Sequence, residues 1–154
     1  MRKKLESYKK FLDKTRIPIR IACKMKNGWP TVVSLWYMHS EGRIYCATQK
    51  RAKIVDYLLN DTRCGFEIAE DNPPYCGIRG QAETRIDGSL GPEVLQILLV
   101  RYLGDIENPL ARKLLAKRDS EVAIILEPSR IFTWDYSDRM RNLNSIDDFE
   151  KVCP

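Results

Sequence analysis

Residues 17–26 alternate between apolar and polar side chains, and the pair Asn27-Gly28 follows them directly. Alternation with a period of two turns one face of a strand toward a hydrophobic core and the other toward water. Asn-Gly is the strongest short-range signal for a tight hairpin turn, because both residues tolerate positive φ. We therefore predict an antiparallel hairpin, and its second strand runs from Thr31 to Met38.

Similar patterns predict the other elements. Further strands are expected over residues 43–48, 64–70, 75–86 and 121–127, and the last resumes at 131–134 beyond Pro128. Helices are expected over residues 3–14, 49–60 and 91–103, and a shorter one begins at Asn108-Pro109. The glycines at 77 and 80 inside a strand indicate a bulge or a close approach of another backbone.

Strands that follow one another through hairpins favour an antiparallel sheet, and a sheet of this length is expected to curl. We predict a mainly β fold, a six-stranded antiparallel barrel with flanking helices. The 154 residues are expected to form one domain over 1–154. Its N-terminal helix lies within 1–16, and residues 137–154 form a polar C-terminal extension.

Composition excludes several classes of protein. With 44% hydrophobic and 31% charged residues, the chain is not a disordered one. No apolar run approaches the roughly 18 residues that a transmembrane helix needs. The first six residues lack the apolar stretch of a secretory signal, so we expect a cytoplasmic protein. The net charge of +5 is a modest excess, for which we favour a solvated surface of mixed sign with a basic bias. The alternative is an anionic partner, either nucleic acid or a phosphorylated small molecule.

Cysteine and histidine usage argues against catalysis by side chains. The five cysteines contain no C-x-x-C pair, so we predict no metal site. Buried free thiols are the default expectation, and one disulfide is the alternative. His39 is the only histidine, and we expect a structural or surface role for it. We name no catalytic residue, and we expect any chemistry to come from a bound cofactor.

The segment from Thr48 to Lys53 carries three cations where a strand is predicted to pass into a helix, with Thr48 as the expected N-cap. Cations at a helix N-terminus oppose the macrodipole at a cost of about 0.3–1 kcal/mol each. A bound phosphate would reverse this cost, since backbone N–H groups and basic side chains would face one dianion. Lys50, Arg51 and Lys53 are therefore candidate phosphate ligands. The alternative is a solvated basic turn.

Five stretches, taken in order, resemble the FMN-binding split-barrel superfamily around pyridoxamine 5'-phosphate oxidase. They are residues 28–37, 42–48, 51–61, 74–83 and 130–135. The resemblance implies an antiparallel split barrel of the FMN-binding type. It also implies FMN as the cofactor, and a homodimer with two flavins at its interface.

The resemblance also assigns individual site residues. Those expected to contact the flavin ring and its ribityl chain are Val33, Ser34, Trp36, Cys46, Ala47, Thr48 and Tyr75. The 5'-phosphate is expected on Arg51 and Lys53, with Lys50 in support. Trp134 resembles a tryptophan that reaches the flavin from the partner subunit.

The resemblance implies an oxidoreductase that passes a hydride or electrons through flavin N5 to an unidentified small substrate. The family's C-terminal arginine–histidine motif has no counterpart here, since no histidine follows His39. We therefore do not expect synthesis of pyridoxal phosphate. Alternatives are a reductase that uses the deazaflavin coenzyme and a non-catalytic flavin-binding protein. A more distant alternative is a nucleic-acid-binding module, suggested by the net charge and by Arg20, Lys24 and Lys26.

Overall fold

The computed structural model describes residues 8–140, so residues 1–7 of the predicted N-terminal helix and 141–154 of the predicted C-terminal extension lie outside it. The strands are β1 (Ile19–Lys24), β2 (Pro30–Leu35), β3 (Met38–Ser40), β4 (Arg43–Gln49), β5 (Arg63–Ala69), β6 (Cys76–Asp87) and β7 (Glu121–Asp135). The helices are α2 (Lys9–Lys14), α3 (Lys53–Asn60), α4 (Gly91–Leu103) and α5 (Pro109–Leu115), with short 3₁₀ turns η1 (Arg118–Ser120) and η2 (Asp138–Met140).

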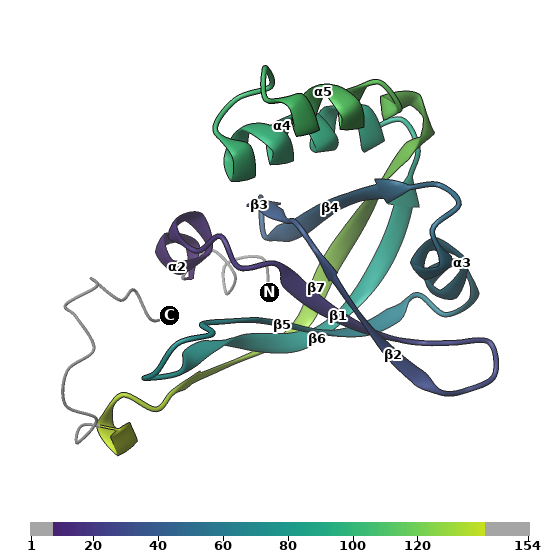
Figure 1. Ribbon diagram of the computed structural model, residues 1–154. Helices are drawn as coiled ribbons and strands as arrows, with labels where there is room; N and C mark the ends of the chain where they lie inside the picture. Colours follow the sequence, from purple (N-terminus) through teal and green to yellow (C-terminus); the bar gives the residue numbers. More distant parts are fainter. Residues whose placement is uncertain (1–7, 141–154) are drawn as a thin grey trace.

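The strands form one antiparallel sheet in the order β2-β1-β5-β6-β7-β4-β3. The sheet curls until β2 crosses close to β4, as Figure 1 shows. These two strands touch without forming a ladder, so the sheet does not close. The predicted antiparallel, mainly β fold with flanking helices is confirmed.

Residues 8–140 contain seven strands, whereas the sequence pattern predicts six. The difference arises at Trp36-Tyr37, where the predicted strand 31–38 breaks into β2 and β3. Tyr37 is fully buried, and its hydroxyl donates a hydrogen bond to the carbonyl of Leu12 at 3.1 Å. Burying this side chain against α2 turns the backbone away from the direction of β2, which explains the break.

The longest strand, β7, shows a second difference from the prediction. Pro128 was expected to interrupt it, but the strand continues through the proline to Asp135. The ladder with β6 shifts its register here: Gln81 faces Arg130, and the next residue, Ala82, faces Pro128. The extra residue is Ser129, which has no ladder partner on β6. A proline is tolerated inside a sheet mainly at or beside such a bulge, because the ladder is already interrupted there.

Two hydrophobic layers hold the fold together. The main core lies inside the curled sheet and includes Ile21, Ile68 and Ile124. The second lies between the outer side of β4 and β7 and the helices α4 and α5, which cover these strands in Figure 1. In residues 8–140, no helix is long and apolar enough to cross a membrane.

The two glycines inside β6 allow other groups to approach closely, as their positions predict. A Cβ on Gly77 would lie 2.6 Å from the carbonyl oxygen of Ile68. A Cβ on Gly80 would lie 2.7 Å from the ring of Phe66, and closer still to the carbonyl oxygen of Arg130. Only glycine fits at these positions without displacing the neighbouring strands.

We predict that Gly80→Ala destabilises the protein by about 1–3 kcal/mol, the usual cost of overpacking a core. Gly88→Ala is the matched control, because a Cβ there meets nothing within 4 Å. Its effect should stay within about 0.5 kcal/mol. Urea unfolding followed by circular dichroism measures both. Equal unfolding free energies for the two variants would contradict the close approach at Gly80.

Candidate functional site

The basic turn lies between β4 and α3. Thr48 is not the N-cap that the sequence suggests, because it belongs to β4 and pairs with Val122 of β7. The ladder continues to Gln49, whose carbonyl then accepts the N–H of Ala52 at 2.8 Å. Helix α3 therefore begins at Lys53, with Ala52 as its N-cap. Lys50 and Arg51 lie in the turn itself and Lys53 in the first helical position.

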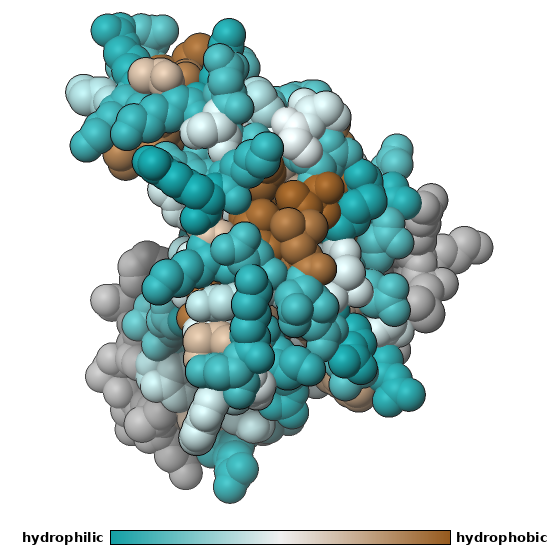
Figure 2. All heavy atoms as spheres, turned by 90° about the vertical axis from the view of Figure 1, so that its right-hand side faces the viewer, coloured by the Kyte–Doolittle hydropathy of each residue, from teal (hydrophilic) through white to brown (hydrophobic). Residues whose placement is uncertain are grey.

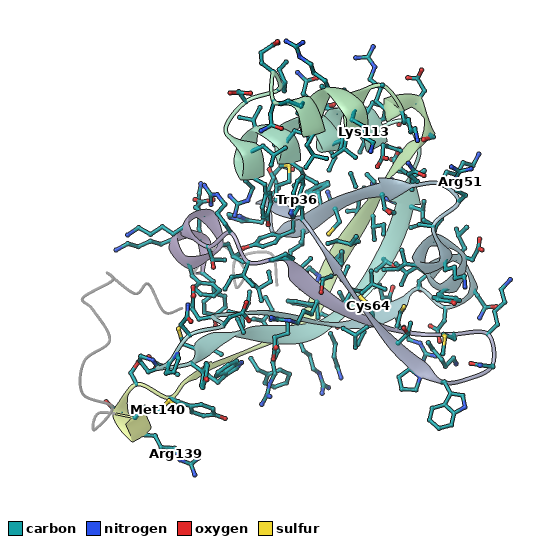
Figure 3. The ribbon with its side chains drawn as sticks, viewed as in Figure 1. Trp36, Arg51, Cys64, Lys113, Arg139 and Met140 are labelled. Carbon is teal, nitrogen blue, oxygen red and sulfur yellow. The ribbon has the colours of Figure 1, made fainter. Side chains whose placement is uncertain are left out.

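The turn presents positive charge that no ion pair among the described residues neutralises. Lys50, Arg51 and Lys53 are exposed, and within residues 8–140 none of them forms an ion pair. Arg51 extends away from the body of the molecule in Figure 3. Ala52 has no side-chain oxygen to accept the first N–H groups of α3. Free N–H groups and unpaired cations together suit a phosphate dianion.

The backbone of Lys50 is fixed from the other side. Its N–H donates to the carbonyl of Ser120 at 2.7 Å, at the point where η1 passes into β7. The next residue, Glu121, pairs with Gln49 and is only 6% exposed. Burial raises the pKa of the Glu121 carboxyl above its usual value. Sequence reasoning did not single out this acid, because nothing in its apolar run marks it as a neighbour of the turn.

Strand β4 leads into the turn with one open edge. Its partner β3 pairs only with residues 43–45, whereas β7 pairs with residues 44–49 on the other side. In the described part of the chain, the edge of Cys46, Ala47 and Thr48 that faces away from β7 has no strand partner. The thiol of Cys46 is fully buried in the main core, so only its backbone remains for a ligand.

The predicted site residues of β2 and its end have different surroundings. Val33 packs against the main core, and Ser34 is exposed. Trp36 lies beyond the end of β2 and stacks on Tyr102 of α4, with ring centroids 4.9 Å apart and an angle of 7° between the planes. Figure 3 shows Trp36 beneath α4. Its ring is thus used for packing between the sheet and α4.

Tyr75 and Trp134 lie together at the far end of the sheet. The N–H of Tyr136 donates to the carbonyl of Tyr75 at 2.9 Å, and the ring of Trp134 lies 5.2 Å from that of Tyr136. The indole Nε1 of Trp134 is buried and has no hydrogen-bond acceptor among the described residues. A buried donor without an acceptor is costly, so this atom is suited to a ligand or partner acceptor.

The structure therefore separates the predicted site residues. Apart from Val33, Ser34 and Trp36, one group surrounds the basic turn beside Glu121, and the other contains Tyr75 and Trp134. Glu121 and Trp134 are 13 residues apart on β7. At about 3.3 Å per residue, this separation is roughly 40 Å along the strand. A single chain does not bring both groups to one small ligand.

The side of the molecule that carries the turn also exposes apolar surface. Figure 2 faces this side and shows hydrophobic residues gathered in its middle, with hydrophilic residues around them. Leu59 of α3 is 65% exposed. An apolar surface next to unpaired cations suits a ligand that joins a phosphate to a larger apolar group.

Three of the cysteines are the buried free thiols that the sequence predicts. They are Cys23, Cys46 and Cys64. Cys76 is disulfide-bonded, so the default of a free thiol is wrong at this position and the alternative of one disulfide holds. Cys153 lies outside the described residues. No group of three or more metal-ligating side chains occurs in residues 8–140.

Comparison with known proteins identifies the fold. No family model and no curated protein matches the sequence. A conserved hypothetical protein from Mycobacterium tuberculosis is similar in structure, with a TM-score of 0.73 and 18% identity over 92% of this chain and 89% of that one. An F420 reductase matches with a TM-score of 0.64 and 17% identity over 80% of this chain and 94% of that one.

A pyridoxamine 5'-phosphate oxidase-like protein from Listeria innocua also matches. Its TM-score is 0.62, with 13% identity over 86% of this chain and 96% of that one. The chain therefore has the split-barrel fold of the pyridoxamine 5'-phosphate oxidase-like proteins, which confirms the resemblance seen in the sequence.

We predict that Cys46 and Cys64 resist alkylation in the folded protein. Burial raises the pKa of both thiols, that of Cys64 to about 12. At pH 8 a thiol of that pKa is ionised in about one molecule in ten thousand, whereas an ordinary exposed thiol is about a quarter ionised. Peptide mass spectrometry after iodoacetamide treatment should find label at these positions only in urea. Rapid labelling of the native protein would contradict their placement in the core.

Proposed function

We propose that the chain binds FMN at the basic turn and acts as an oxidoreductase on a small organic substrate. The observation that carries the proposal is the turn itself, where Lys50, Arg51 and Lys53 surround the uncapped start of α3 and form no ion pair with any described residue. In the proposed complex, the 5'-phosphate takes this place. The nearest acid in α3 is Asp56, also in the first turn of the helix.

In this proposal, the last residues of β4 orient the rest of the cofactor. The open backbone edge at Cys46, Ala47 and Thr48 offers N–H and carbonyl groups to the polar edge of a flavin ring. Bound FMN would supply hydride or electron transfer at N5, which no side chain here supplies. The chain's own part is to hold the phosphate, fix the ring against β4 and keep water from one of its faces.

Completing such a site requires a second copy of the chain. Trp134 lies roughly 40 Å along β7 from the turn, and Tyr75 lies at the same end of the sheet. Both would therefore reach the cofactor only from a partner chain. In the homodimer that we propose, the Trp134 Nε1, which has no acceptor within residues 8–140, would help to hold the cofactor of the other chain. Two-fold symmetry then builds two equal sites.

An apolar trough on the outer side of the sheet offers a contact surface for that second copy. It has a volume of about 550 Å³ and is lined in part by Val32, Gly65, Gly80 and Phe132. Val32 is 63% exposed and Phe132 51% exposed. Large apolar side chains exposed together in this way are typical of interaction surfaces.

The deazaflavin coenzyme is the second cofactor that we consider. One structural neighbour is an F420 reductase, and another is described as an FAD-binding protein from Mesorhizobium loti. The turn recognises a phosphate group and does not distinguish these molecules by itself. Titration with each cofactor separates the alternatives, because the correct one should bind far more tightly. Binding of FMN without turnover of any donor or acceptor would instead indicate a non-catalytic flavin-binding protein.

We predict that the double variant Arg51→Ala with Lys53→Ala binds FMN at least a hundredfold more weakly than the parent. Charge-assisted hydrogen bonds contribute about 1.5–3 kcal/mol each, and two of them are removed. Quenching of flavin fluorescence on binding measures the affinity. Riboflavin lacks the phosphate, so it should bind the variant and the parent about equally.

The matched control is Lys9→Ala with Lys10→Ala, which removes two exposed cations from α2. This control should leave FMN affinity unchanged. If the variant at the turn keeps the parental affinity for FMN, the phosphate site lies elsewhere. If both double variants lose affinity equally, the effect reflects overall charge and not the turn.

A mixing experiment tests the shared site. Trp134→Ala should also weaken FMN binding, because it removes the partner's contribution. When this variant is refolded with an equal amount of the variant at the turn, half of the dimers combine the two chains. Each of these has one intact site, so about a quarter of all sites should recover. No recovery on mixing, despite dimer formation, would contradict a site built from two chains.

A further inference from the structure

A second pocket lies on the opposite side of the molecule from the basic turn. It has a volume of about 590 Å³ and is bounded by the end of α2, by β3 and by one face of α4. Helix α4 supplies Glu93, Ile97, Val100 and Arg101. Ile97 is four residues after Glu93, and Val100 and Arg101 are three and four residues after Ile97, so all four share one face of the helix. From Glu93 to Arg101 this face extends about 12 Å along the helix.

The pocket is positively charged at the C-terminal end of α4. Arg101 Nη2 donates to the carbonyls of Leu12 at 2.5 Å and Thr15 at 2.8 Å, and Arg16 Nε donates to the carbonyl of Arg101 at 3.0 Å. Among the described residues, neither guanidinium has a carboxylate partner. Arg101 Nε is buried and has no acceptor within residues 8–140. In the described part of the chain, these two neighbouring cations therefore form no ion pair.

Neither acid that lines the pocket, Asp13 or Glu93, forms an ion pair with Arg16 or Arg101 among the described residues. Asp13 Oδ1 lies 3.5 Å from His39 Nδ1, and the His39 side chain is only 4% exposed. Asp13 therefore directs its carboxylate toward the histidine. Glu93, the other acid of the pocket, lies at the opposite end of the α4 face, about 12 Å from Arg101.

The middle of the pocket is apolar. Ile97 is 40% exposed and Val100 is 50% exposed, and Met38 of β3 also lines the pocket. A ligand that covers these side chains removes apolar surface from water. Each Å² of apolar surface buried in this way favours binding by about 25 cal/mol. A ligand that joins an anionic head to an apolar body would satisfy both parts of the pocket.

We propose that this pocket binds organic carboxylates with an apolar chain, the carboxylate on Arg16 and Arg101 and the chain along Ile97 and Val100. The site is separate from the basic turn. Helix α4 begins at Gly91, which packs against Glu121 beside the turn, and runs to Arg101 near α2, as Figure 1 shows. The inference therefore does not depend on the proposed cofactor.

The test compares three probes by isothermal titration calorimetry on the full chain. Octanoate carries both features, octanol lacks the charge and acetate lacks the chain. We expect octanoate to bind at least tenfold more tightly than either of the others. Equal binding of octanol, or no binding of octanoate, would overturn the proposal.

Two variants locate the binding. Arg16→Gln should weaken octanoate binding at least tenfold without changing the affinity for octanol, since it removes the charge and the guanidinium's bond to the carbonyl of Arg101 but leaves the apolar wall in place. Val100→Gln should weaken octanoate by a similar factor through the apolar wall. Arg16 is exposed and Val100 is 50% exposed, so we expect both variants to fold. Thermal unfolding checks this expectation.

The matched control is Lys113→Gln, which removes an exposed cation from α5 at the top of the view in Figure 3. This variant should bind octanoate like the parent. An equal loss of affinity in the Lys113 variant would show non-specific attraction to a basic protein and would overturn the assigned site.

Discussion

The pairing of β7 with both β4 and β6 organises the molecule. The ladder with β6 runs from Cys76 opposite Asp135 to Asp87 opposite Ala123, and the ladder with β4 occupies the first part of the same strand. Without β7, the strands β3 and β4 would have no connection to the rest of the sheet. The same strand also fixes where functional residues lie, because its start touches the basic turn and its end carries Trp134.

The length of β7 bears on the proposed cofactor site, because it separates Trp134 from the basic turn within one chain. The bulge at Ser129, next to Pro128, lets β7 continue to Asp135, so Trp134 lies far from the turn. There its Nε1 remains without an acceptor among the described residues. A second chain that covers the exposed sheet would use the long strand, the unpaired indole and the apolar trough together. Each of these features is otherwise unfavourable for an isolated chain.

Local sequence patterns predicted most of the strands and helices but not their exact limits. Alternation and Asn27-Gly28 identified the first hairpin, since register follows directly from a period of two. The predicted start of α3 was wrong, because Thr48 pairs with Val122 of the distant strand β7 and so belongs to β4. The break at Trp36-Tyr37 was also missed, since it depends on a bond to Leu12 that local patterns do not contain.

The candidate site was predictable to a similar extent. Three cations at a strand–helix junction marked the turn, because their charge is unfavourable there without a ligand. The sequence did not indicate that Trp36 stacks on Tyr102, or that Glu121 is buried beside the turn. Likewise, the pocket between α2, β3 and α4 joins residues from three distant segments. Such features follow from the tertiary fold and leave no local signal.

The most direct test of the central claim is to measure whether the purified protein retains FMN. The protein would be saturated with FMN, freed of excess ligand by gel filtration and denatured, and the released molecule would be identified by mass spectrometry. The proposed site predicts FMN at one molecule per chain, together with the visible absorption of a bound flavin before denaturation. Release of no flavin from folded protein would contradict the assignment of the basic turn as a flavin phosphate site.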